Sequence, residues 1–229
     1  PPPPSKLAVG QATPEALARG QAALQGAAAL AGGSAAWAAI KGVATEGAEV
    51  LHMGGQSISM TGATKWRLPD RVLAVRKMPM GEIRQGCDGT VAWVAAMGQL
   101  QEQPRGVKAV REEYERSFFR LFGQPGAYEV QLLDEPRVVD GVSHAVAVVK
   151  SETTKDWVLL FAPDGQLVRM EYMGEGMGGA PARTVEIFAD WKDVGGVKWP
   201  HSTRTLMDDT PVMETTVTGV TLNPDLPDE

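Results

Sequence analysis

The chain has 229 residues and a formal net charge of -6, an acidic balance that excludes a general nucleic-acid-binding surface. Its hydrophobic fraction of 43% and charged fraction of 22% are those of an ordinary globular protein that can bury one substantial core. No segment holds the roughly 18 to 20 consecutive apolar residues that a membrane-spanning helix needs.

The N-terminal region predicts a linker followed by a helix. Four prolines open residues 1–12, which we interpret as a Pro-rich linker. Thr13 followed by Pro14 is typical of a helix start, with a capping side chain and a proline in the first turn. The Ala/Leu-rich stretch continues this helix to Leu30, and a short helical turn around Trp37 follows the glycines that end it.

Beyond this region the sequence has the pattern of β-strands. Between residues 57 and 68, apolar side chains such as Met60 alternate with polar ones such as Ser59, as in a strand with one solvated face. Similar segments follow, and short turns separate several of them. The later predicted strands are residues 71–78, 82–85, 90–97, 128–133, 142–151, 156–162, 166–173, 183–191, 197–206 and 212–222.

The turns between these segments decide the topology. Four dipeptides are typical of tight turns: Asp88-Gly89, Asp140-Gly141, Asp164-Gly165 and Gly195-Gly196. Short turns can join only antiparallel neighbours. We therefore predict a mostly β (α+β) protein, a single antiparallel half-barrel meander of about ten to eleven strands.

One segment interrupts the strands with helical spacing. From residue 104 to residue 122, apolar residues recur on one stripe between charged ones. Glu112, Glu113 and Glu115 lie between Arg111 and Arg116, and we interpret them as a solvated helix face with neighbouring ion pairs. We predict one inserted helix here that covers the concave face of the sheet. The stripe consists of Val107, Val110, Tyr114, Phe118 and Leu121.

Several segments carry a family resemblance: the Ala-rich first helix, the Asp88-Gly89 turn before Trp93, the hairpin of residues 160–170 (LFAPDGQLVRM), and residues 191–201 (WKDVGGVKWPH). Together they resemble the LolA-like outer-membrane lipoprotein-sorting (lipoprotein carrier) domains. The resemblance covers residues 13–229, which we treat as one domain.

This resemblance has two implications. It implies a half-barrel whose concave apolar face, covered by helices, receives acyl chains of lipoproteins or related lipids, in a periplasmic or cell-envelope-associated protein. LolA-like domains also occur behind insulinase-like zinc peptidase domains, joined by linkers, and the Pro-rich start resembles such a junction. The resemblance rests on structural turns, so it indicates a fold more directly than a function.

The chemistry-bearing residues predict no catalytic, metal or cofactor site. His52, His144 and His201 stand alone, and the His-x-x-Glu-His helix of insulinase-like peptidases is absent from the sequence. Cys87 is the single cysteine and has no neighbouring base in the sequence. The glycine-rich run of residues 174–179 lacks the Lys-Ser/Thr pair of a phosphate loop, so we interpret it as a hairpin connection.

Six tryptophans and ten methionines are the most informative feature, since methionine lines surfaces that repack around variable ligands. The same residues would also suit an ordinary filled core. Our first hypothesis is a non-catalytic lipid- or lipoprotein-binding envelope domain that holds acyl chains in an apolar cavity between sheet and helices. The residues expected to line this cavity are Met60, Trp66, Val75, Met78, Trp93, Phe118, Phe122, Met170 and Tyr172.

The alternative hypothesis is an accessory domain that positions a substrate or partner for an insulinase-like metallopeptidase domain lying outside this sequence. The expected partner is thus either an acyl chain or lipoprotein, or a peptidase domain of the same protein, and not a nucleic acid. An open apolar cavity favours the first hypothesis, and a filled interior with an exposed apolar patch favours the second.

Overall fold

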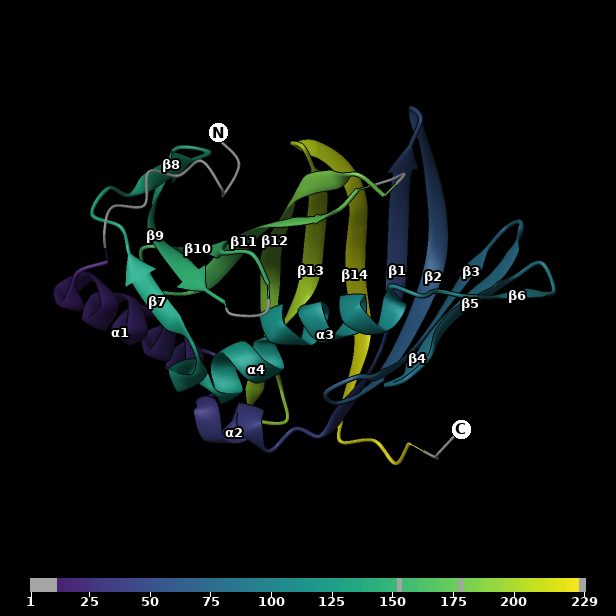
Figure 1. Ribbon diagram of the computed structural model, residues 1–229, viewed down its shortest axis with the longest axis horizontal. Helices are drawn as coiled ribbons and strands as arrows, with labels where there is room; N and C mark the ends of the chain where they lie inside the picture. The colour runs from purple at the N-terminus through teal and green to yellow at the C-terminus, as the bar shows by residue number, and fades with distance from the viewer. Residues whose placement is uncertain (1–11, 152–153, 177–178, 227–229) are drawn as a thin grey trace.

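The computed structural model describes residues 12–151, 154–176 and 179–226. Over these ranges the chain forms one open antiparallel sheet of 14 strands that curves around four α-helices (Figure 1). The predicted fold class, a mostly β protein with a single antiparallel sheet, is confirmed. Residues 1–11, which make up nearly all of the predicted linker, lie outside the described residues.

The helices have the positions that their capping residues favour. Thr13 caps the first helix, because its hydroxyl accepts a hydrogen bond from the Ala16 amide at 3.1 Å. Gly20 lets this helix approach the sheet closely, since a Cβ there would lie 2.2 Å from the Val130 carbonyl oxygen. The helices are α1 (Pro14–Leu30), α2 (Ser34–Ala38), α3 (Gly106–Arg116) and α4 (Phe118–Gly123), followed by a 3-10 turn, η2 (Pro125–Ala127).

The sheet consists of two meanders joined by the first and last strands. Its order is β6-β5-β4-β3-β2-β1-β14-β13-β12-β11-β10-β9-β7, and β8 pairs with β9 off this path. The strands are β1 (Gly42–Met53), β2 (Gln56–Arg67), β3 (Arg71–Met78), β4 (Gly81–Asp88), β5 (Ala92–Ala96), β6 (Gln99–Glu102), β7 (Glu129–Leu132), β8 (Arg137–Val139), β9 (Val142–Lys150), β10 (Trp157–Phe161), β11 (Leu167–Glu175), β12 (Pro181–Val194), β13 (Val197–Met207) and β14 (Thr210–Leu222).

Three of these strands, β1, β6 and β8, lie outside the segments expected from the sequence. β1 is central, since it pairs with both β2 and β14. Its two glycines and two glutamates hide the strand pattern, yet Gly47 is needed at a bulge where a Cβ would lie 2.1 Å from the Thr216 carbonyl oxygen. β6 and β8 are only a few residues long, so alternation gives little signal in them.

The single inserted helix expected over residues 104–122 is two helices in the structure. Ser117 is extended, with φ -68° and ψ 153°, and its hydroxyl donates to the Tyr114 carbonyl at 2.7 Å. A serine that bonds to the backbone in this way competes with the helical hydrogen-bonding pattern. The break turns α4 away from α3, and both helices lie across the hollow of the sheet, as expected (Figure 1).

The core lies between the helices and the inner face of the sheet. Trp37 on α2 is fully buried there and contacts aromatic rings of α4 and β13. A smaller apolar cluster, formed by Val146, Val148, Val158 and Leu160, packs the opposite face beside β8. None of the helices in the described ranges is both long and apolar enough to cross a membrane.

A buried charge cluster lies on the outer face of the sheet. The Glu171 carboxylate, which has no exposed surface, is bonded by Arg169 at 2.7 Å, Arg137 at 2.8 Å and Arg183 at 3.1 Å. Arg183 also bonds Asp209 at 2.6 Å. The cluster ties β8, β11, β12 and the turn before β14 together.

Candidate functional site

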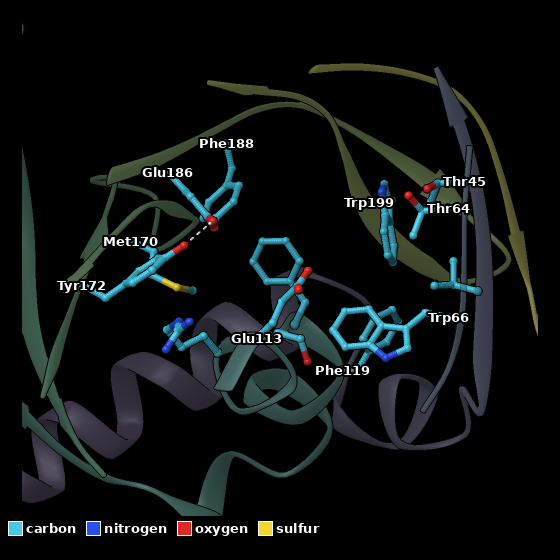
Figure 2. A pocket seen from close by; sticks show the side chains of 14 residues that line it. Thr45, Thr64, Trp66, Glu113, Phe119, Met170, Tyr172, Glu186, Phe188 and Trp199 are labelled. Carbon is cyan, nitrogen blue, oxygen red and sulfur yellow. Dashed lines mark hydrogen bonds between the residues drawn. The ribbon is translucent and has the colours of Figure 1, made fainter. Parts of the chain in front are cut away.

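A pocket of about 200 Å³ lies where α3 and α4 cross the inner face of the sheet (Figure 2). One wall comes from β1 and β2, the opposite wall from β11 and β12, and the helices and β13 supply the remaining sides. Its apolar lining residues are Val43, Trp66, Phe118, Phe119, Met170, Phe188 and Trp199, and its polar ones are Thr45, Thr64, Glu113, Arg116, Ser117, Tyr172 and Glu186.

Strand register places the lining residues of β1 and β2 side by side. Val43 pairs with Trp66, and Thr45 pairs with Thr64. Because successive side chains of a strand point to opposite faces, every second residue of each strand faces the pocket. The two threonines lie next to each other above the Trp66 indole in Figure 2.

Aromatic packing forms the floor of the pocket. Phe118, at the start of α4, lies 4.8 Å from Phe188 of β12 between ring centroids. Phe119 lies 5.8 Å from Trp66 of β2, edge to face. The helix break at Ser117 sets the direction of both phenylalanines, so α4 bridges the two walls. The Trp66 indole N–H is buried and has no hydrogen-bond partner among the described residues.

The ionisable side chains of the pocket gather toward the β11–β12 wall. The Tyr172 hydroxyl donates a hydrogen bond to the Glu186 carboxylate at 2.9 Å. The Arg116 guanidinium stacks over the Tyr172 ring, 4.1 Å from its centroid. Glu113 extends from α3 into the space between the two walls (Figure 2).

The position of Glu113 changes its protonation. Desolvation by the surrounding walls, and then the charge of Glu186, raise the pKa of Glu113 to about 7, against the opposing effects of Arg116 and Arg76. The residue is nevertheless exposed to solvent, since it lies at a pocket that is open to the surface. Burial likewise raises the pKa of Glu186, although the Tyr172 hydrogen bond and Arg116 oppose the shift.

The raised pKa of Glu113 predicts a pH-dependent stability. Between about pH 4.5 and pH 7 the folded state holds a proton that the unfolded chain releases, so wild-type stability should fall as the pH rises through this window. Glu113→Gln removes this dependence. In thermal melts, the melting temperature of Glu113→Gln relative to the wild type should therefore rise from about pH 5 to pH 8. The melting temperature of Glu112→Gln, whose side chain lies beside Lys108, should follow that of the wild type. Parallel pH profiles of the wild type and Glu113→Gln would contradict the assignment.

The structure places four of the nine expected cavity residues in this pocket, namely Trp66, Phe118, Met170 and Tyr172. Phe122 is buried beneath it in the core, where its ring centroid lies 5.5 Å from that of Trp37. Met60 lies on the same face of β2 as Trp66, but farther along the strand and opposite Glu49.

The other three residues lie away from the pocket. Met78 shares the inner-face parity of β3 but lies at the far end of that strand. Val75 and Trp93 have the opposite parity and belong to the outer face. Trp93 sits there across from Gly86, where a Cβ would lie 2.4 Å from the indole, and it lines a separate outer hollow with Lys65.

The interpretation of the α3 acids as a solvated face is wrong for Glu115, which is buried with its carboxylate 2.7 Å from Arg120. Glu113 is exposed, as expected, but it also lines the pocket. Arg116 and Glu186 also line the pocket, although neither was expected there from the sequence. One signal was available for Glu113, which borders the apolar stripe at i+3 from Val110.

The described residues hold no group of three His, Cys, Asp or Glu side chains placed to bind a metal ion. His52 contacts Ser57, and His144 and His201 contact backbone carbonyls of their own strands. Cys87 is free and buried. In the glycine-rich run, Gly174 and Glu175 end β11, and residues 177–178 lie outside the described residues.

Sequence comparison finds no matching family model and no match among curated proteins. Comparison of folds matches solved structures over nearly the whole chain. An outer membrane lipoprotein-sorting protein domain from Vibrio parahaemolyticus is 12% identical, with a TM-score of 0.57, over 93% of this chain and 95% of its own. A LolA superfamily protein from Nitrosomonas europaea is 12% identical, with a TM-score of 0.58, over 91% of this chain and 95% of its own. A DUF1329 family protein from Desulfovibrio piger is 10% identical, with a TM-score of 0.59, over 93% of this chain and 95% of its own.

Proposed function

Because the chain has the fold of the LolA-like lipoprotein-sorting domains, we propose that it is a non-catalytic lipid- or lipoprotein-binding domain of the cell envelope. Its ligand is an acyl chain held between the inner face of the sheet and the helices α3 and α4. The observation that carries the proposal is the pocket at this position, to which both walls contribute apolar side chains.

The size of the pocket sets what it accepts. Its volume of about 200 Å³ is below the roughly 300–1,000 Å³ of pockets for drug-sized ligands, so it suits a segment of one chain and not a whole lipid. Each methylene buried there contributes about 0.8 kcal/mol before ordering costs are subtracted. Met170, in the wall, is a side chain that adapts to ligands of different shape.

The partner and the compartment follow from the same proposal. An acyl chain attached to a lipid or a lipoprotein is the expected partner, and the periplasm or the envelope is the expected location. The alternative role beside an insulinase-like peptidase stays a prediction, and no contact among the described residues favours it.

Filling the pocket should abolish binding. The neutral fluorophore N-phenyl-1-naphthylamine is expected to bind wild-type protein with micromolar affinity, because the pocket offers apolar and aromatic surface. Thr64→Phe places a ring in the space beside Thr45 and should weaken binding by about tenfold or more, measured by fluorescence titration.

The next residue of β2 supplies the matched control. Lys65 lies on the opposite face of the sheet, outside this pocket, so Lys65→Phe adds the same ring without obstructing the site. It should bind the probe as the wild type does. Absence of binding to a folded wild-type protein, or equal loss in both variants, would refute the proposed site.

A further inference from the structure

The Glu113 carboxyl lines the pocket without a hydrogen-bond partner among the described residues. Unlike Glu186, which accepts the Tyr172 hydrogen bond, Glu113 makes no hydrogen bond or ion pair with another described residue. Glu113 is exposed to solvent, so its carboxylate is free to bond a group that enters the pocket. An unpaired acid that points into a binding pocket is therefore positioned to meet a group of the ligand.

The charges around the pocket define what that group is. Two carboxyls, Glu113 and Glu186, and one guanidinium, Arg116, are among the lining residues. The guanidinium is stacked on Tyr172. The next cation, Arg76, is bonded to Glu49 at 2.8 Å. With both acids ionised, the lining has one more negative than positive charge. It therefore attracts a cationic group of a ligand and repels an anionic one.

The neighbouring groups also make Glu113 responsive to a cation. Those acting on it come from each element around it: Arg116 on its own helix, Glu186 of β12, Tyr172 of β11 and Arg76 of β3. Burial and Glu186 hold its pKa near 7, so the proton is easily lost when a positive charge arrives. A ligand ammonium would supply both the missing charge and N–H donors for the carboxylate.

Resting on the proposed function, we propose that Glu113 selects the head group of the ligand, so that the pocket prefers an amphiphile with a protonated amine over one with a carboxylate. The apolar tail lies among Trp66, Phe118 and Met170, and the amine lies between Glu113 and Glu186. A carboxylate head would meet two like charges, which Arg116 alone does not offset.

Ligands that differ only in the head group test this selection. Dodecylamine, dodecanol and dodecanoate should each displace N-phenyl-1-naphthylamine from the wild-type protein at about pH 8. We expect the amine to bind at least about tenfold more tightly than the carboxylate, with the alcohol between them. Glu113→Gln should reduce the amine's advantage to about threefold or less, and lowering the pH to about 5.5 should do the same, because protonation neutralises Glu113.

A neighbouring acid of α3 provides the control. Glu112, 3.4 Å from Lys108, does not line the pocket, so Glu112→Gln should keep the wild-type order of affinities. Equal or tighter binding of dodecanoate, or an amine preference unchanged in Glu113→Gln, would overturn the head-group assignment and leave the acyl-chain pocket standing. Failure of all three ligands and the fluorophore to bind would overturn both, and loss of binding in Thr64→Phe locates the ligand in this pocket.

Discussion

Replacing Glu171 with glutamine is expected to lower the free energy of unfolding by about 3–5 kcal/mol. The carboxylate has no exposed surface and is bonded by three arginines, of which Arg183 is 4% exposed at its side chain. Glutamine fills nearly the same volume but carries no charge. The variant would therefore keep three cations at the buried face with only Asp209 to offset them.

The effect should depend on pH in a defined direction. Burial alone would raise the pKa of Glu171, but Arg137, Arg169 and Arg183 outweigh it, so the pKa lies below the ordinary 4.5. A lowered pKa gives stability that is complete above the unfolded pKa and is lost as the pH falls through the folded value. The difference in free energy of unfolding between wild type and Glu171→Gln should thus be largest at neutral pH and shrink below about pH 4.5.

Urea denaturation of the two proteins measures this difference. Glu82→Gln is the matched control, because its carboxylate is bonded to Arg84 at 2.5 Å at a more exposed position of β4. Loss of such a pair should cost less than about 1 kcal/mol. If Glu171→Gln cost no more than this control, the cluster would not stabilise the outer face as its geometry indicates.

Replacing Trp37 with alanine is expected to lower the free energy of unfolding by about 3–5 kcal/mol and to weaken ligand binding. The indole is fully buried, stacks on Trp199 at 5.9 Å between centroids, and lies 6.1 Å from Phe118. Because both rings line the pocket, the void left by alanine would let its floor collapse. Denaturation midpoints and fluorophore titration of the same samples measure the two effects.

Trp37→Phe separates packing from hydrogen bonding. The indole N–H donates to the Ala31 carbonyl at 2.9 Å, a bond that ties α2 to the end of α1. Phenylalanine keeps most of the ring contacts, so its cost should be nearer 1–2 kcal/mol. Equal costs for the two variants would show that the hydrogen bond, and not the packing, is what Trp37 contributes.

The sequence alone determined the local architecture of this protein. Turn residues such as Asp140-Gly141, both with positive φ, and the Thr13 cap lie where the pattern placed them, because backbone strain and capping act over a few residues. The antiparallel sheet followed from the same short turns, and the resemblance to LolA-like domains rested on them as well.

Only the tertiary structure decided which residues share the pocket. Alternation within a strand assigns two faces, but the register between strands decides which face is the inner one, so Trp66 lines the pocket while Trp93 lies on the outer face. Glu113 and Glu171 carry the same side chain. Contacts between distant segments place the first at the pocket beside Glu186 and surround the second with arginines, so the pKa of Glu113 is raised and that of Glu171 is lowered.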